Sequence, residues 1–236
     1  MINRKILYNY IPGQIFSKYY EKKSKNSINK HYWKDMSENE IWYNMCLCLL
    51  SSNVFYELAL SVTTVLCEKG LLNHEWINSN VNSIDILSKE MAKPQFEPIR
   101  NNGSYRKYRY HISKAKNIVE NSKKIYNNDI NILNILNKNI SEYKKRNSLV
   151  NQISGFGLKQ TSHFLRNIGC AESLAIIDTH IVKFLGNITK PPILPNKNIS
   201  KKKYFELEQV LQDICKTLNL ELTFFDMAIW EYMRMW

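Results

Sequence analysis

Two side chains of complementary chemistry, Lys159 and Asp178, lie 19 residues apart. A lysine amine can attack the C1′ carbon of a sugar, and a carboxylate can stabilise the positive charge that develops while a base departs. Asp178 ends a short apolar run at residues 174–177, a strand-like pattern that would deliver the carboxylate to a pocket. Each residue also has a simpler interpretation. Lys159 can be a solvated residue in the first turn of a helix, and Asp178 can cap a helix that begins near Thr179.

The lysine follows a tight turn that contains two glycines, Gly155 and Gly157. The pattern predicts that one helix ends near Gln152 and that the next begins at Leu158. Glycine lets a backbone approach an oxygen closely, and the start of a helix presents unpaired N–H groups, so this turn suits a DNA phosphate. We identify a helix–hairpin–helix motif at about residues 142–168. A plain structural turn between two helices is the alternative.

Helical patterns dominate the rest of the chain. Ser37 and Glu40 form a capping box before an apolar run through Leu50, which predicts a buried helix. We predict further helices at about residues 54–69 and 83–91, and a long helix that follows a loop opened by Gly103-Ser104 and ends near Tyr126. Asp129 and Ser141 are predicted as the N-caps of two more, and a last helix is predicted at 223–236. The 7 Gly and 6 Pro are too few for a sandwich or barrel of short strands. The predicted fold class is therefore all-α.

The start of the chain differs from the rest. The first 35 residues are rich in Lys and Tyr and contain a Pro12-Gly13 break. We therefore divide the chain into a basic, loosely attached lead-in at residues 1–36 and a folded core at residues 37–236.

Composition narrows the class of partner. The chain has 236 residues, and its 33 basic and 21 acidic side chains give a net charge of +12. This excess points first to nucleic acid and second to an anionic membrane surface, although Lys, Asn, Ile and Tyr are also abundant in AT-rich coding sequences. No apolar run approaches a membrane span and no secretory signal is recognisable, so we expect a cytoplasmic, nucleoid-associated protein.

The five cysteines have no CxxC pair and no zinc or iron–sulfur spacing. We interpret them as buried or unreactive thiols in a reducing compartment. The sequence therefore predicts no metal cluster.

Three elements together carry a family resemblance: the glycine hairpin with Lys159, the run Ser162-His-Phe-Leu-Arg-Asn167, and Ile-Ile-Asp178-x-His180. They resemble the helix–hairpin–helix (HhH-GPD) DNA glycosylases, and most closely the compact archaeal and bacterial 8-oxoguanine DNA glycosylase/AP lyases. The resemblance covers residues 37–236. It implies a two-lobed helical fold with the active site in the cleft between the lobes, and no iron–sulfur cluster, because only Cys215 follows Cys170.

The resemblance also implies an activity and roles for individual residues. Lys159 would form a Schiff base with the sugar and Asp178 would assist base departure, so that the enzyme excises 8-oxoguanine and nicks the strand by β-elimination. The partner would be double-stranded DNA with an oxidised purine, bound by a monomer. Residues inferred to bind DNA are Asn53, as a wedge in the gap left by the flipped nucleotide, Tyr105 and Arg106, as probes of the partner base, and Gly155, Gly157 and His180, as phosphate contacts.

The base pocket and a cation site are inferred from the same resemblance. His163, one turn beyond Lys159, and the flat rings of Trp230 and Trp236 would line the pocket. The backbone carbonyls of Asn151, Ile153 and Phe156 match a site for K⁺ or Na⁺ at the hairpin, and no other cofactor is expected.

Alternatives remain for several of these residues. Asn53 can be a helix cap, His163 a packed core histidine, and the C-terminal aromatic residues part of the core. A glycosylase for another damaged base, or a non-catalytic DNA-binding protein that uses the hairpin as a phosphate clamp, are the alternative functions.

Overall fold

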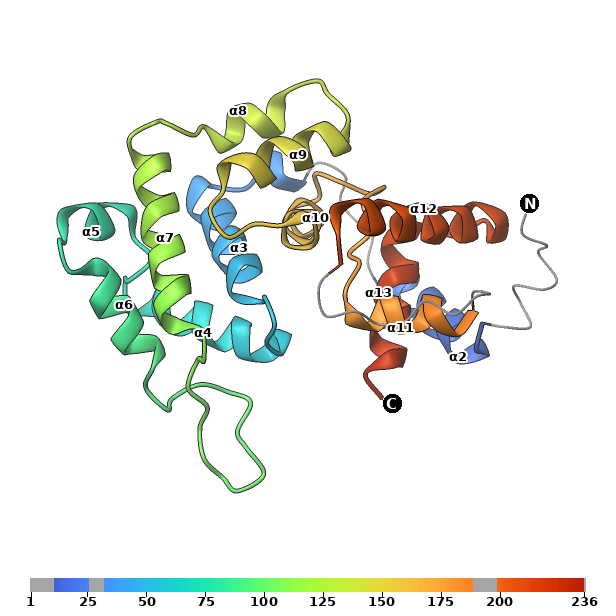
Figure 1. Cartoon of the computed structure of the whole chain (residues 1–236), viewed down its shortest axis with the longest axis horizontal. Helices are drawn as coiled ribbons and strands as arrows, with labels where there is room; N and C mark the ends of the chain where they lie inside the picture. Colours follow the sequence, from blue (N-terminus) through green and yellow to red (C-terminus); the bar gives the residue numbers. More distant parts are fainter. Residues whose placement is uncertain (1–10, 26–31, 189–198, 236) are drawn as a thin grey trace. The chain divides into compact units, whose positions relative to one another are not determined.

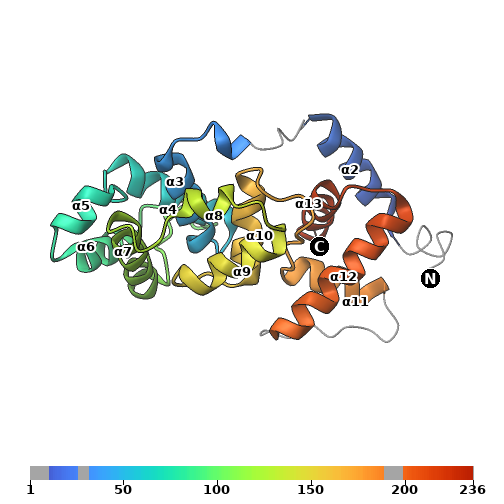
Figure 2. The ribbon, with the colours of Figure 1, turned by 90° about the horizontal axis from the view of Figure 1, so that it is seen from above.

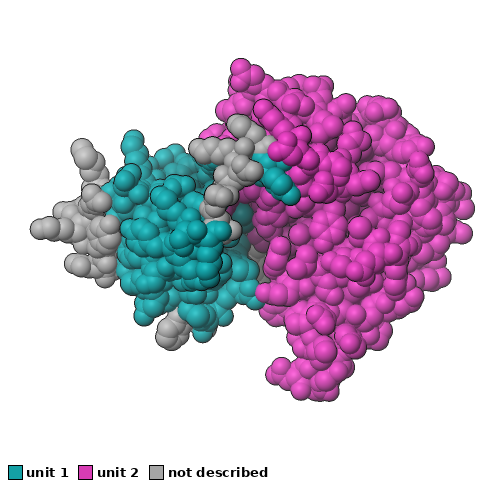
Figure 3. All heavy atoms as spheres, turned by 180° about the vertical axis from the view of Figure 1, so that it is seen from behind, with its two compact units in different colours: residues 1–32, 169–236 teal, residues 33–168 magenta. Residues whose placement is uncertain are grey.

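The computed structural model describes residues 11–25, 32–188 and 199–235. The chain divides into two compact units (Figure 3): a central unit of residues 33–168, and a terminal unit of residues 1–32 and 169–236. Within the described ranges every regular element is helical, apart from an isolated antiparallel bridge between Phe96 and Arg106. The all-α prediction is therefore confirmed. No helix in these ranges is both long enough and apolar enough to span a membrane.

The central unit is built around α3, whose apolar residues are almost all buried. This helix packs against α4, α7 and α10 (Figure 1). A short 3-10 turn (Tyr32–Lys34) precedes the helices of the unit. These helices are α3 (Glu38–Leu50), α4 (Tyr56–Glu68), α5 (His74–Ser79), α6 (Ser83–Met91), α7 (His111–Tyr126), α8 (Ile132–Asn137), α9 (Glu142–Gln152) and α10 (Leu158–Asn167).

The terminal unit joins the two ends of the chain. Its helices are α2 (Gly13–Lys25), α11 (Thr179–Ile188), α12 (Lys201–Leu218) and α13 (Leu222–Met233). In Figures 1 and 2, α2 lies beside α13. Tyr19 of α2 is buried, its ring meets Phe224 edge-on, and its hydroxyl accepts a hydrogen bond from the N–H of Glu221.

The basic residues of α2 form ion pairs with glutamates. Lys18 and Lys22 form ion pairs with Glu231, and Lys23 pairs with Glu221 at 2.7 Å. The prediction of a loosely attached lead-in is therefore wrong for Gly13–Lys25. The alternation of Lys with Ile15 and Tyr19 is an amphipathic pattern whose apolar face needs α13 to cover it.

Most of the predicted helix boundaries agree with the structure. Ser37 and Glu40 form both hydrogen bonds of the capping box, and Ser141 caps α9. Asp129 was wrongly predicted as an N-cap: the cap of α8 is Asn131, whose side chain accepts from the N–H of Asn134. Asn and Asp cap equally well, so the sequence pattern alone did not separate the two positions.

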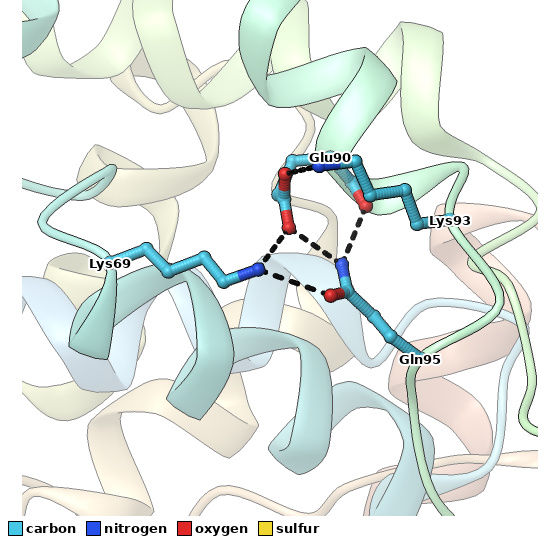
Figure 4. Close-up of polar contacts among 4 residues, drawn as sticks. All are labelled: Lys69, Glu90, Lys93 and Gln95. Atoms are coloured by element: carbon cyan, nitrogen blue, oxygen red, sulfur yellow. Dashed lines mark hydrogen bonds and ion pairs between the residues drawn. The ribbon is translucent and has the colours of Figure 1, made fainter.

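A long connection at residues 92–110 leaves α6 and projects away from the helices before it returns to α7 (Figure 1). Charged and polar side chains form a cluster at the start of this connection (Figure 4). Glu90 accepts hydrogen bonds from Lys69, Lys93 and the side-chain amide of Gln95. Burial opposes ionisation of Glu90, but these three hydrogen bonds outweigh it and lower its pKa to about 2.

Candidate nucleic-acid interface and active site

The predicted helix–hairpin–helix motif is present in the central unit. Gly155 in the turn has φ +82°, a conformation that side chains rarely adopt. A Cβ atom there would lie 2.2 Å from Nδ2 of Asn117 and 2.9 Å from Cδ1 of Leu49. Gly157 differs: it is the N-cap of α10 in extended backbone, and a Cβ atom would meet only Gln160 Oε1 at 3.6 Å. The fold thus requires glycine at 155, whereas at 157 glycine leaves open space beside the exposed helix start.

Helix α7 holds this turn through side chains that the sequence analysis did not identify. Nδ2 of Asn121 donates to the carbonyl of Ser154 at 2.9 Å, and Oδ1 of Asn121 accepts from the Ser154 N–H at 2.8 Å. The hydroxyl of Ser154 donates to Glu120 at 2.6 Å, and Lys124 donates to both residues. Hydrogen bonds within the protein therefore fix the shape of this turn. No local pattern marks Asn121, because its partner lies 33 residues away.

A buried arginine ties the two helices of the motif together. Arg146 of α9 is fully buried, and its Nη1 donates to the hydroxyl of Ser162 on α10 at 3.0 Å. This buried hydrogen bond helps to fix the relative orientation of the two helices.

Lys159 lies partly buried in the first turn of α10, where its charge acts on Cys48 of α3. The buried thiol of Cys48 on α3 accepts from Nδ2 of Asn167 at 3.7 Å; burial raises its pKa, and Lys159 partly offsets this. The ring of His163 lies 6.1 Å from that of Tyr56. Burial, together with the charges of Lys159 and Arg166, lowers the pKa of His163 to about 3. The imidazole one turn beyond Lys159 is therefore neutral at physiological pH.

Asp178 belongs to the terminal unit, at the end of an extended segment. Residues 174–178 do not form a strand of a sheet. Their backbone groups form hydrogen bonds with side chains of α12 and α13 instead. Glu208 accepts from the N–H of Ala175 at 2.9 Å, and Asp226 accepts from that of Ile176 at 3.2 Å. The hydroxyl of Tyr204 donates to the Ala175 carbonyl at 2.8 Å. These three residues, which the sequence analysis did not identify, fix the path of the segment.

The capping interpretation of Asp178 is confirmed. Its Oδ1 accepts from the N–H groups of His180 and Ile181, both at 2.9 Å, at the start of α11. Among the described residues no partner holds Oδ2. One oxygen thus fixes the carboxylate at the helix start, and the other is left for a second role.

The predicted wedge and probe residues lie near one another in the central unit. Asn53 is exposed in the turn between α3 and α4 with φ +59°, and its carbonyl accepts from Arg109 at 3.1 Å. The helix-cap alternative for Asn53 is wrong, because the N-cap of α4 is Phe55. Tyr105 is exposed, and the guanidinium of Arg106 lies over the ring of Phe55.

The remaining predicted residues lie in the terminal unit. Nδ1 of His180 has no hydrogen-bond partner in the described part of the chain. Trp230 is half-buried on α13, and the Arg234 guanidinium covers its ring at 4.3 Å. Trp236 lies outside the described residues. Phe224 of the same helix is buried and meets Tyr19 of α2, so that part of the C-terminal aromatic pattern is core.

The donor set at the hairpin fits a monovalent cation. Asn151, Ile153 and Phe156 belong to the end of α9 and the following turn, where carbonyl groups lack the partners that a continuing helix would give. The carbonyl of Ile153 also accepts from the N–H of Phe156 at 3.2 Å. Neutral oxygens of this kind would hold K⁺ or Na⁺ at the hairpin.

Sequence comparisons agree with these features. A family profile described as 8-oxoguanine DNA glycosylase matches residues 76–220. A protein of Saccharolobus islandicus named 8-oxoguanine DNA glycosylase/AP lyase is 31% identical over 205 residues, which are 86% of this chain and 87% of that protein. A protein of the same name from Methanocaldococcus jannaschii is 31% identical over 202 residues, which are 86% of this chain and 84% of that protein.

Solved structures show the same fold. The crystal structure of the Methanocaldococcus jannaschii 8-oxoguanine glycosylase/lyase in complex with 15mer DNA containing 8-oxoguanine has a TM-score of 0.69 and 28% identity, covering 93% of this chain and 96% of that one. The fold of the Thermotoga maritima 8-oxoguanine DNA glycosylase is also similar, with a TM-score of 0.68 at 22% identity over 92% of this chain and 93% of that one. With a profile that matches well over half of its length and relatives that align along most of it, the chain belongs to the 8-oxoguanine DNA glycosylase family.

Proposed function

We propose that this protein excises 8-oxoguanine from double-stranded DNA and then cleaves the strand at the resulting abasic site. The placement of Lys159 carries the proposal: its amine lies in the first turn of α10, directly after a turn suited to a phosphate. Relatives that align over most of the chain bear the name glycosylase/AP lyase. A monofunctional glycosylase would have no need of a lysine at this position.

The proposed reaction begins when the hairpin amides bind a phosphate and the damaged nucleotide rotates out of the duplex. The deprotonated amine of Lys159 attacks C1′, and the bond from C1′ to the base breaks with its electron pair leaving on the base. The carboxylate of Asp178 stabilises the positive charge that develops on the sugar. Loss of a further proton from the nitrogen and opening of the sugar ring give a Schiff base. Removal of a C2′ proton then expels the 3′ phosphate by β-elimination.

In the proposed reaction, side chains of the protein assist every bond change. We propose that K⁺ or Na⁺ at the carbonyls of Asn151, Ile153 and Phe156 supports the hairpin as it binds phosphate, and that no further cofactor takes part. Because the proposed substrate is chromosomal DNA, we place the protein in the cytoplasm with the nucleoid.

Borohydride trapping tests the nucleophile. Reduction of a Schiff base links enzyme and DNA covalently, so the wild type should be trapped on an 8-oxoguanine duplex. Lys159→Gln should abolish the cross-link, whereas Lys89→Gln, at an exposed position of α6, should retain it. Persistent trapping of Lys159→Gln would exclude Lys159 as the nucleophile.

Strand cleavage separates the proposal from its alternatives. Duplexes with 8-oxoguanine, an abasic site, thymine glycol or a methylated purine are each incubated with the enzyme, with and without heat–alkali treatment. Cleavage of the 8-oxoguanine and abasic duplexes without alkali supports the proposal. Binding without cleavage of any duplex indicates a phosphate clamp, and excision of another base alone indicates a different glycosylase. The salt dependence of binding does not separate these functions, because phosphate contacts dominate the affinity in each of them.

A further inference from the structure

Helix α2 contacts α13 at the point where α13 begins. Glu221 is the N-cap residue of α13, and its side chain makes no capping hydrogen bond. The hydroxyl of Tyr19 accepts from the Glu221 N–H at 3.1 Å, and Lys23 pairs with the Glu221 carboxylate. The first N–H groups of a helix lack partners within the helix. Helix α2 therefore supplies one of the hydrogen bonds that the start of α13 needs.

A second set of contacts joins the same two helices near the end of α13. Lys18 and Lys22, one turn apart on α2, both form ion pairs with Glu231. The side chains of these three residues are only 24%, 23% and 30% exposed, so solvent screens their charges less than it does at the open surface. Lys25 and Glu21 pair instead within α2, with side chains that are 69% and 51% exposed.

Other residues of α13 hold the segment that leads to Asp178. Asp226 accepts from the N–H of Ile176 at 3.2 Å, two residues before the proposed catalytic carboxylate. The ring of Phe225 meets that of Phe184 on α11 edge-on, with 6.2 Å between the ring centroids. Asp178 itself caps α11. Helix α13 therefore contacts both α2 and the two elements that determine where Asp178 lies.

We infer that α2 positions the carboxylate of Asp178 through α13, with Tyr19 as the central positioning residue. The inference rests on the proposed function, in which Asp178 assists base departure. Tyr19 is buried, and its ring meets Phe224 of α13 edge-on. A misplacement of about 1 Å can lower the rate of a catalysed step about 100-fold, so a carboxylate that stabilises a developing charge must be held in place. The contacts of α2 restrict the movement of the helix that holds it.

The test compares two single-turnover rates: excision of 8-oxoguanine, and cleavage of a duplex that already contains an abasic site. Only excision needs base departure, so displacement of Asp178 lowers the ratio of excision to abasic cleavage. A smaller folded fraction lowers both rates by the same factor and leaves the ratio unchanged. Tyr19→Phe, which removes one hydrogen bond, should lower the ratio about two- to ten-fold. Tyr20→Phe, at the adjacent exposed ring, should retain it.

The ion pairs with Glu231 provide a second variant. Lys18→Gln combined with Lys22→Gln leaves Tyr19 in place and should lower the ratio about two- to five-fold. Lys25→Gln, which removes an ion pair within α2, is the matched control and should retain the ratio. A wild-type ratio in both Tyr19→Phe and the lysine double variant would overturn the inference and leave the proposed excision intact.

A double-mutant cycle tests whether α2 acts through Asp178. Asp178→Asn should lower the ratio, and Tyr19→Phe added to it should lower the ratio no further. A further loss in this double variant would show that α2 acts by another route and would overturn the positioning role. A wild type that excises no 8-oxoguanine would overturn the proposed function together with the inference.

Discussion

The side-chain amide of Asn121 pairs with both backbone polar groups of Ser154, in the way that one strand pairs with another. The two hydrogen bonds measure 2.9 and 2.8 Å, and Asn121 is buried. They connect α7 to the turn that precedes α10. The turn that we propose to bind phosphate thus depends on a residue from another helix for its shape.

Replacement of Asn121 by Ala should therefore weaken both the fold and DNA binding. The N–H and C=O of Ser154 would lose their partners inside the protein, at a cost of about 1–3 kcal/mol in the free energy of unfolding. Urea unfolding measures this loss, and fluorescence anisotropy measures the accompanying loss of affinity for duplex DNA. Asn137→Ala, at an exposed position of α8, is the matched control and should change neither quantity. Equal stability of the two variants would refute the role of Asn121.

The two glycines of the hairpin should respond differently to alanine. Gly155→Ala places a methyl group against Asn117 and Leu49 in a left-handed conformation, so the free energy of unfolding should fall by at least about 1 kcal/mol. Gly157→Ala meets no close protein atom, so its stability should stay within about 1 kcal/mol of the wild type. Its affinity for duplex DNA should fall, because the methyl group would lie where a phosphate must approach. Unchanged affinity of Gly157→Ala would argue against a phosphate at that position.

Glu90 should make the stability of the protein depend on pH. Its pKa is lowered to about 2 in the fold, below the usual value of 4.5, so the ionised form stabilises the fold. This stabilisation is fully present above about pH 5 and is lost as the pH falls toward 2. Glu90→Gln should cost about 1–3 kcal/mol at pH 7, and less as the pH approaches 2.

Urea unfolding of the wild type and Glu90→Gln at pH 7 and pH 3 provides the measurement. Asp85→Asn is the control, because Asp85 pairs with Lys89 at the surface, where an ion pair contributes at most about 1 kcal/mol. A Glu90→Gln effect that does not shrink at pH 3 would contradict this account.

Asp178 caps α11, and we propose that it also assists base departure; asparagine distinguishes the two roles. Asp178→Asn keeps an oxygen that can accept from His180 and Ile181, so the unfolding temperature and duplex affinity should change little. Base excision should fall at least about 100-fold, because a neutral amide stabilises a sugar cation poorly. Asp178→Ala removes the cap as well and should cost about 0.5–2 kcal/mol of stability. Excision by Asp178→Asn at the wild-type rate would restrict Asp178 to capping.

Local features were readable from the sequence. The capping box at Ser37, the cap at Ser141, and the hairpin with Lys159 in the first turn of α10 depend on hydrogen bonds between residues a few positions apart. Their residue types therefore determine them without knowledge of the fold. The error at Asp129 lies at the same local level, since two good capping residues stand close together there.

Other features needed the tertiary structure. Tyr204 and Glu208 form hydrogen bonds with the segment before Asp178, which lies about 30 residues away in the sequence. Asn121 holds the hairpin at Ser154, which is 33 residues away. Helix α2 is a packed helix only because α13 covers its apolar face. Such contacts depend on which helices pack together, and many distant residues decide that. The sequence by itself thus determined which residue types are available for the proposed chemistry, while packing decided what holds them, because burial and long-range hydrogen bonds exist only once the chain has folded.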